Sequence, residues 1–212
     1  MSRPGLNGAL SGADVSALVS TRICHDLISP IGAISNGVEL LAETTGAGSP
    51  ELGLIGDSVN SASARLRCFR IAFGAAPPGT RVPVADLRAG VDAMLGGGRT
   101  RIAIAAGGPQ LPRHTAKLLL LALLCQEAAL PLGGDVQVAA DERRFRIDTA
   151  APRLRDIESL WAVAAGHPPP PHLAPAEVQF LLMGQMLADH GVVLRRQMRD
   201  DGLSLEVAGL PA

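Results

Sequence analysis

Apolar residues recur every three or four positions along residues 23–41 and again along residues 55–73. At about 100° per residue, each set falls on one face of an α-helix. The second set steps by alternating fours and threes, which is a heptad repeat. The pattern therefore predicts two amphipathic helices with matching apolar seams. The seam residues are Ile23, Leu27, Ile31, Ile34, Val38 and Leu41 in the first helix, and Ile55, Val59, Ala62, Leu66, Phe69 and Phe73 in the second.

The segment between the two seams predicts a helical hairpin. We expect the first helix to be capped by Ser11 or Asp14 and to end near Glu43, before the loop 44–49. Pro50 then opens the second helix in its first turn. Because a two-helix hairpin cannot bury both seams alone, we expect a homodimer whose hairpins form a four-helix bundle. The alternative is that the hairpin packs on the rest of its own chain.

A Gly- and Pro-containing linker at 74–79 separates this hairpin from a region of different pattern. We therefore predict a hairpin domain over 13–76 and a second domain over 80–212. The second domain mixes short strands and helices without strict βαβ alternation, which indicates an α+β sandwich. Strands are expected at 82–84, 101–105, 136–138, 145–147, 192–194 and 203–207, and helices at 85–95, 111–130, 154–164 and 176–189.

A His-Asp pair lies early in the first predicted helix. His25 is roughly 170° from the apolar seam on a helical wheel, so the sequence places its imidazole on the solvent side. Pro30 cannot donate a hydrogen bond to the carbonyl of Asp26, so we expect the helix to kink or loosen one turn past His25. This arrangement indicates a phosphoacceptor histidine. Its flanks carry polar or small residues, namely Arg22, Ser29, Gly32 and Asn36.

Composition excludes several classes of function. A net charge of −1 argues against nucleic acid or an anionic membrane as the main partner. The three cysteines show neither zinc spacing nor a disulfide framework, and we predict a cytoplasmic location. The apolar run 118–124 is too short to span a bilayer. His167 and His172 flank a run of prolines and are either metal ligands or solvated loop residues.

The hairpin bearing His25-Asp26-Leu27-x-x-Pro30, followed by a linker and an α+β sandwich, resembles the histidine-kinase core. The resemblance covers nearly the whole chain after residue 12. It implies that residues 13–76 are the dimerisation and histidine-phosphotransfer hairpin. It also implies that residues 80–212 correspond to the ATP-binding catalytic domain.

The nucleotide-binding motifs of that family are degenerate in this chain. Residues 118–134 resemble the asparagine-box helix, but Cys125 stands where the magnesium-holding asparagine falls and Ala128 where the usual lysine falls. The adenine box falls on 148–152, where the aspartate remains and both glycines are replaced. The glycine-rich lid falls on the prolines at 168–171. Because glycines let backbone amides close on phosphates, we expect that this degenerate kinase-like domain does not bind ATP.

A phosphoacceptor histidine without kinase motifs resembles the ChpT-type histidine phosphotransferases, most closely over residues 22–34 and 36–41. The resemblance implies that His25 accepts a phosphoryl group from the receiver aspartate of a CckA-like hybrid histidine kinase. The resemblance also implies that His25 passes the group to CtrA-like and CpdR-like response regulators in a cell-cycle phosphorelay. The resemblance implies a homodimer with no cofactor of its own, and Mg²⁺ is expected on the partner's receiver domain.

The chemistry follows from the residues themselves. A neutral imidazole is nucleophilic near pH 7 and can attack an acyl phosphate, giving a labile phosphorus–nitrogen bond. We assign Asp26 a supporting role, in which it orients the imidazole of His25 or takes its proton. Arg22, Ser29, Gly32 and Asn36 are expected to form part of the docking surface. Two alternative functions stay open, an ATP-dependent histidine kinase with atypical nucleotide boxes and a non-catalytic dimeric adaptor.

Overall fold

The computed structural model describes residues 12–43, 50–74, 76–96, 98–199 and 201–211. Within the first helix, the side chains at 12–14, 16–18, 20–21, 24–26, 28–29 and 42–43 lie outside this description. The expected caps at Ser11 and Asp14, the loop 44–49 and the start of the chain therefore also lie outside it.

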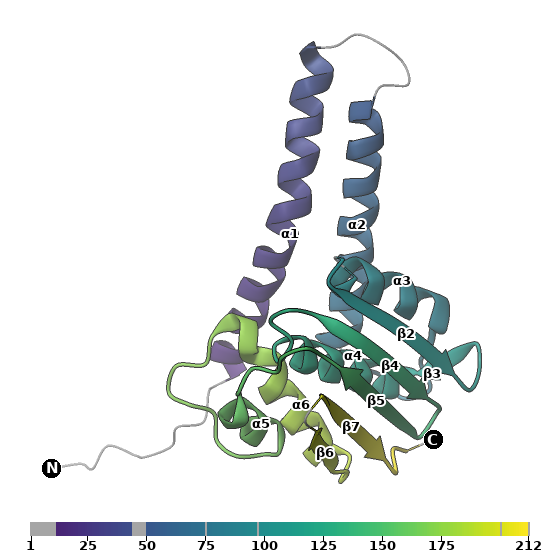
Figure 1. Cartoon of the computed structure of the whole chain (residues 1–212), viewed down its shortest axis with the longest axis vertical. Helices are drawn as coiled ribbons and strands as arrows, with labels where there is room; N and C mark the ends of the chain where they lie inside the picture. Colours follow the sequence, from purple (N-terminus) through teal and green to yellow (C-terminus); the bar gives the residue numbers. More distant parts are fainter. Residues whose placement is uncertain (1–11, 44–49, 75, 97, 200, 212) are drawn as a thin grey trace, which may run out of the picture.

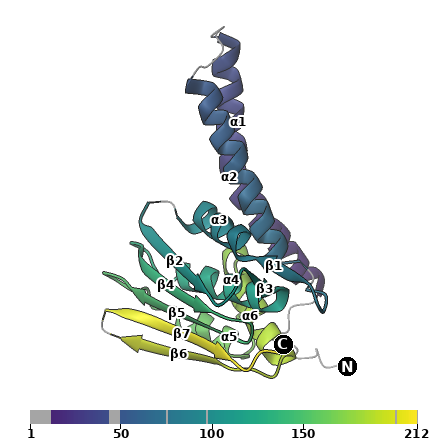
Figure 2. The same ribbon diagram turned by 90° about the vertical axis from the view of Figure 1, so that its right-hand side faces the viewer.

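Two long helices, α1 (Gly12–Glu43) and α2 (Pro50–Ala72), lie side by side and project from the rest of the molecule (Figures 1 and 2). Gly37 of α1 is buried, and the side chain of Ile55 occupies the space that a β-carbon at Gly37 would need. The glycine therefore lets the two helix backbones approach closely. No helix in the described part of the chain is long and apolar enough to cross a membrane.

The second region contains a five-stranded mixed sheet in the order β2-β4-β5-β7-β6. Only β2 and β4 pair in parallel, and the other neighbouring strands are antiparallel. A smaller antiparallel pair joins β1 to β3. The strands are β1 (Arg81–Pro83), β2 (Thr100–Ala106), β3 (Gln110–Pro112), β4 (Gly134–Ala140), β5 (Arg144–Ala150), β6 (Leu194–Arg199) and β7 (Gly202–Ala208).

Helices cover one face of the large sheet and leave the other face open (Figure 2). The strands alternate accordingly, with Phe145 and Ile147 of β5 buried and Arg144 and Arg146 exposed. Leucines of α4, fully buried from Leu118 to Leu124, form the centre of the core. The covering elements are α3 (Val84–Leu95), α4 (Arg113–Glu127), α5 (Glu158–Ala164), the 3₁₀ turn η1 (Pro175–Glu177) and α6 (Val178–Asp189).

Two cationic side chains of α4 form hydrogen bonds that hold the C-terminal end of α2 against the sheet domain. Arg113 Nη2 donates to the carbonyl of Arg70 at 2.6 Å, and Lys117 Nζ donates to the carbonyl of Gly74 at 2.7 Å. The last carbonyls of a helix have no partner within the helix and carry partial negative charge. These bonds therefore give the carbonyls of Arg70 and Gly74 a hydrogen-bond donor and fix the C-terminal end of α2 to α4.

The expected mixture of α and β elements is confirmed, and several boundaries need correction. The predicted helix 111–130 is shorter, because Leu111 and Pro112 belong to β3, which the sequence pattern did not reveal. The predicted helix 154–164 begins only at Glu158. Helix α1 continues through Pro30, and the expected kink or loosening of the helix there stays a prediction. Pro30 is itself buried.

Candidate functional site

His25 lies in the N-terminal half of α1, one helical turn after Arg22, whose side chain contacts Ala176 of the sheet domain. Its side chain, like those of Asp26 and Ser29, lies outside the description. Gly32 and Asn36 follow His25 by seven and eleven residues on one stripe of the helix, and both are exposed. No described atom lies within 4 Å of the position of a β-carbon at Gly32. This stripe of α1 is therefore open beyond His25.

Arg22 lies one helical turn before His25 and contacts the sheet domain. Its side chain is half-buried, and Nη1 donates a hydrogen bond to the carbonyl of Ala176 in η1 at 3.1 Å. Its guanidinium lies near enough to Cys125 to lower the pKa of that thiol, although burial raises the pKa more. Sequence reasoning placed Arg22 on a docking surface and did not reveal this contact, which joins residues far apart in the sequence.

The apolar seams of the two helices are only partly covered within one chain. Ile31 and Val38 of α1 are each 54% exposed. On α2, Leu52, Val59 and Leu66 are 46%, 44% and 54% exposed. These positions are spaced by seven residues on each helix, so they form a continuous apolar stripe along it.

The asparagine-box position of α4 carries a buried thiol. Cys125 is 0% exposed, and burial raises its pKa well above the usual value. A neutral thiol enclosed in an apolar core is a poor ligand for a hard cation such as Mg²⁺. The following residue, Gln126, donates a hydrogen bond to the hydroxyl of Thr149, and both side chains are buried.

Asp148, on which the adenine box falls in the resemblance to histidine kinases, lies on the open face of the sheet. It accepts hydrogen bonds from Arg146 Nε at 2.6 Å and Nη2 at 3.0 Å, and Arg199 lies 3.8 Å away. The hydrogen bond from Arg146 contributes most to lowering the pKa of Asp148. The neighbouring Thr149 is the residue that is buried toward the helices. Asp148 therefore does not line the interior between the sheet and the helices.

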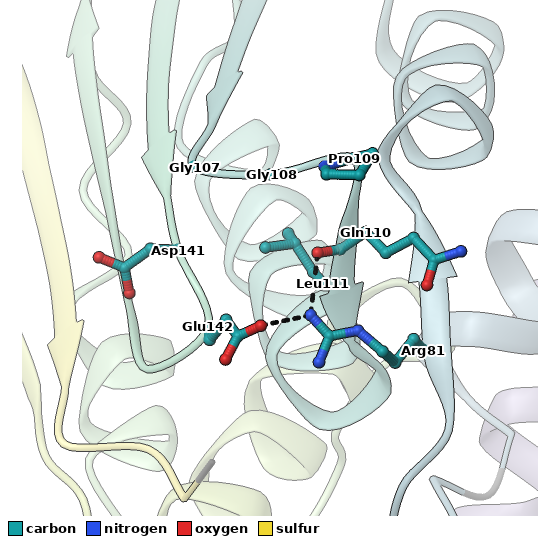
Figure 3. A pocket seen from close by; sticks show the side chains of 8 residues that line it. All are labelled: Arg81, Gly107, Gly108, Pro109, Gln110, Leu111, Asp141 and Glu142. Carbon is teal, nitrogen blue, oxygen red and sulfur yellow. Dashed lines mark hydrogen bonds and ion pairs between the residues drawn. The ribbon is translucent and has the colours of Figure 1, made fainter.

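The cavities of the sheet domain differ in size, and one of about 480 Å³ lies on the open face of the sheet beside Ala105, Arg144 and Glu206. One cavity of about 40 Å³ lies beside Trp161 and Arg155, whereas small-molecule sites typically enclose about 300–1,000 Å³. Another, of about 220 Å³, lies between β3 and the turn from β4 to β5 (Figure 3). There Arg81 forms an ion pair with Glu142 at 2.5 Å, and Asp141 pairs with Arg144 at 2.8 Å. The described part of the chain holds no group of three or more potential metal ligands.

The family model described as the histidine phosphotransferase C-terminal domain matches residues 84–202. The chain therefore belongs to the histidine phosphotransferase family. It is 37% identical over 165 residues to the protein phosphotransferase ChpT of Brucella abortus (strain 2308), which covers 76% of this chain and 78% of that protein.

Solved structures give a consistent result. A structure described as a bacterial phosphotransferase superposes with a TM-score of 0.75 and 32% identity, over 94% of this chain and 98% of that one. The histidine kinase domain of a blue-light-activated kinase from Erythrobacter litoralis gives a TM-score of 0.46 and 14% identity, over 84% of this chain and 95% of that one. Because this similarity is low, the relation of the sheet domain to kinase catalytic domains stays a prediction.

Proposed function

We propose that this protein carries a phosphoryl group on His25 between receiver-domain aspartates of a bacterial phosphorelay. The observation that supports this most directly is the 37% identity to a protein phosphotransferase over most of both chains. The donor is proposed to be the receiver of a hybrid sensor kinase, and the acceptor the receiver of a response regulator. In this proposal a second protein approaches His25 on α1, the helix that projects from the sheet domain.

The residues near His25 need to supply alignment more than strong catalysis. A nitrogen of the neutral imidazole attacks the phosphorus of the donor's aspartyl phosphate, and the donor's carboxylate leaves. In onward transfer, the aspartate of the second receiver attacks the phosphorus and the imidazole of His25 leaves. In this proposal Asp26 orients the imidazole or takes its proton, and Ser29, Gly32 and Asn36 contact the receiver. Mg²⁺, proposed to be held by the receiver, neutralises charge on the phosphoryl group when it is bound.

We propose further that the chain has no autokinase activity. The asparagine-box position is a buried thiol, and Asp148 is paired with arginines on the open face of the sheet. Neither group can take part in holding a nucleotide between the sheet and the helices. These two observations favour a phosphotransferase over the ATP-dependent kinase that the sequence left open.

A homodimer is part of the proposal. The exposed stripes of α1 and α2 repeat every seven residues, as the facing residues of a helical bundle do. A groove of about 460 Å³ runs along the base of this face and is lined mainly by apolar side chains, including Ile23, Leu66 and Phe73. A second copy related by a two-fold axis would bury the stripe and the groove together.

The proposal is tested by mixing the protein with a phosphorylated receiver domain and, separately, with labelled ATP alone. Each mixture is repeated with His25→Ala. We expect acid-labile label on the protein from the receiver, no label from ATP, and no label on His25→Ala. Label from ATP alone would show a kinase. Absence of label with every cognate receiver, together with full biological activity of His25→Ala, would favour the adaptor.

A further inference from the structure

At the junction between α1 and the sheet domain, two side-chain donors share one backbone carbonyl. Arg22 Nη1 donates to the carbonyl oxygen of Ala176 at 3.1 Å, and Gln179 Nε2 donates to the same oxygen at 2.8 Å. The two donors come from different parts of the molecule, α1 and α6. The carbonyl therefore connects the helix that carries His25 to the helical layer over the sheet.

The acceptor carbonyl is itself held in place. Glu177 accepts a hydrogen bond from the backbone N–H of Ala174 at 3.1 Å and donates its own backbone N–H to the carbonyl of Ala174 at 2.9 Å. Gln179 is 1% exposed, and its Nε2 also lies 3.5 Å from the carbonyl of Leu124 in α4. These contacts fix the η1 turn to α4 and α6 independently of its hydrogen bond with Arg22.

The side-chain amide of Gln179 has one bonded and one unbonded polar atom. Its Oε1 is buried and has no hydrogen-bond partner among the described atoms. Burying an amide oxygen without a partner costs free energy, whereas an apolar side chain of the same shape would avoid that cost. Gln179 Nε2 donates a hydrogen bond to the Ala176 carbonyl, which also accepts the hydrogen bond from Arg22.

We infer that Arg22 is a positioning residue for phosphotransfer, which fixes the His25 turn of α1 against the sheet domain. Residues three apart are neighbours on a helix surface, so a bond at Arg22 restrains the turn that carries His25. Misplacement of a reacting group by about 1 Å can cost about a hundredfold in rate. This inference rests on the proposed function, and it assigns Arg22 a role within its own chain in place of contact with the receiver.

The test compares transfer from a phosphorylated receiver for the wild type, Arg22→Ala and Arg22→Lys, with Arg153→Ala as a control in an exposed loop. We expect Arg22→Ala to lower kcat by about tenfold or more with little change in KM for the receiver. We expect Arg22→Lys to recover part of this loss, because a lysine can still donate to the carbonyl. Labelling of His25 by phosphoramidate, a small donor that needs no docking, should change less than about twofold.

A second variant tests the shared carbonyl. Gln179→Met keeps the side-chain volume and removes the donor, and it is combined with Arg22→Ala. Because both residues act through Ala176, their effects on kcat should be clearly less than additive.

Each outcome has a distinct meaning. If KM rises and kcat is unchanged in Arg22→Ala, Arg22 contacts the receiver and the inference is wrong. Additive effects, or equal loss of receiver and phosphoramidate labelling, would also overturn it. If the wild type itself takes no label from any receiver, the proposed function fails first. If the wild type is labelled and Arg22→Ala matches it, only the inference fails.

Discussion

The sulfur of Cys68 in α2 occupies the space that a β-carbon on Gly90 in α3 would need. Both residues are buried, so this contact sets how closely the hairpin approaches the sheet domain. The contact lies near the C-terminal end of α2, close to the bonds from Arg113 to the carbonyl of Arg70 and from Lys117 to the carbonyl of Gly74, just past the helix. The helix pair is therefore fixed to the body by packing on one side and hydrogen bonds on another.

Gly90→Ala is expected to destabilise the protein by about 1–3 kcal/mol, because the added methyl group forces the helices apart. Gly53→Ala is the matched control, since no described atom lies within 4 Å of a β-carbon at that helical position. That control should stabilise the protein by about 0.5–1 kcal/mol. Urea unfolding measures both. Equal free energies of unfolding for the two variants would contradict the close approach.

Cys68 and Cys125 are expected to resist alkylation in the folded protein. Burial raises the pKa of Cys68 to about 12 and that of Cys125 well above its usual value. Only the thiolate is nucleophilic, and neither thiol is accessible. Iodoacetamide at neutral pH should leave both unmodified until guanidinium is added, as peptide mass spectrometry can show. Modification of either residue in the native protein would show that it is not buried in solution.

The stability of the fold is expected to fall on mild acidification through His190. Partial burial, together with His114 at a ring-centroid distance of 5.4 Å, lowers the pKa of His190 below its ordinary value of 6.5, and Asp189 opposes the shift. The unfolded chain then binds its proton first as the pH falls, so folded stability declines below about pH 6.5 and is retained above it.

The free energy of unfolding, measured from about pH 7 to about pH 5, should fall less in His190→Gln than in the wild type. His167→Gln, in an exposed loop, serves as the control and should keep the wild-type slope. Identical slopes for all three proteins would rule out a contribution from His190.

Charge introduced into the exposed stripe is expected to give monomers. Val59→Glu places a carboxylate where the proposed dimer buries an apolar side chain, and an unpaired buried charge is strongly unfavourable. Asn60→Glu changes the neighbouring exposed position outside the stripe and should leave the dimer intact. Light scattering after size-exclusion chromatography gives the mass of each variant. A monomeric wild type, or a dimeric Val59→Glu, would contradict the proposed bundle.

Much of the architecture could be predicted from local patterns. Helix boundaries at Pro50 and near Glu43, and the presence of strands at 136–138 and 145–147, follow from periodicity and from residues that begin or end elements. Short β3 was missed because three residues carry too little periodicity. The kink or loosening expected at Pro30 stays a prediction, since α1 is one helix that includes this residue.

The sequence by itself located the candidate phosphoacceptor and the two apolar seams, because each depends on residues close together in the chain. The loss of the nucleotide motifs is what the resemblance to histidine kinases implies. Only the tertiary structure decided that Arg22 meets Ala176, that Asp148 belongs to the open face of the sheet, and that Ile31 and Val59 are left exposed in one chain. These relationships depend on contacts between distant segments and on strand register, in which a shift of one residue moves a side chain to the opposite face.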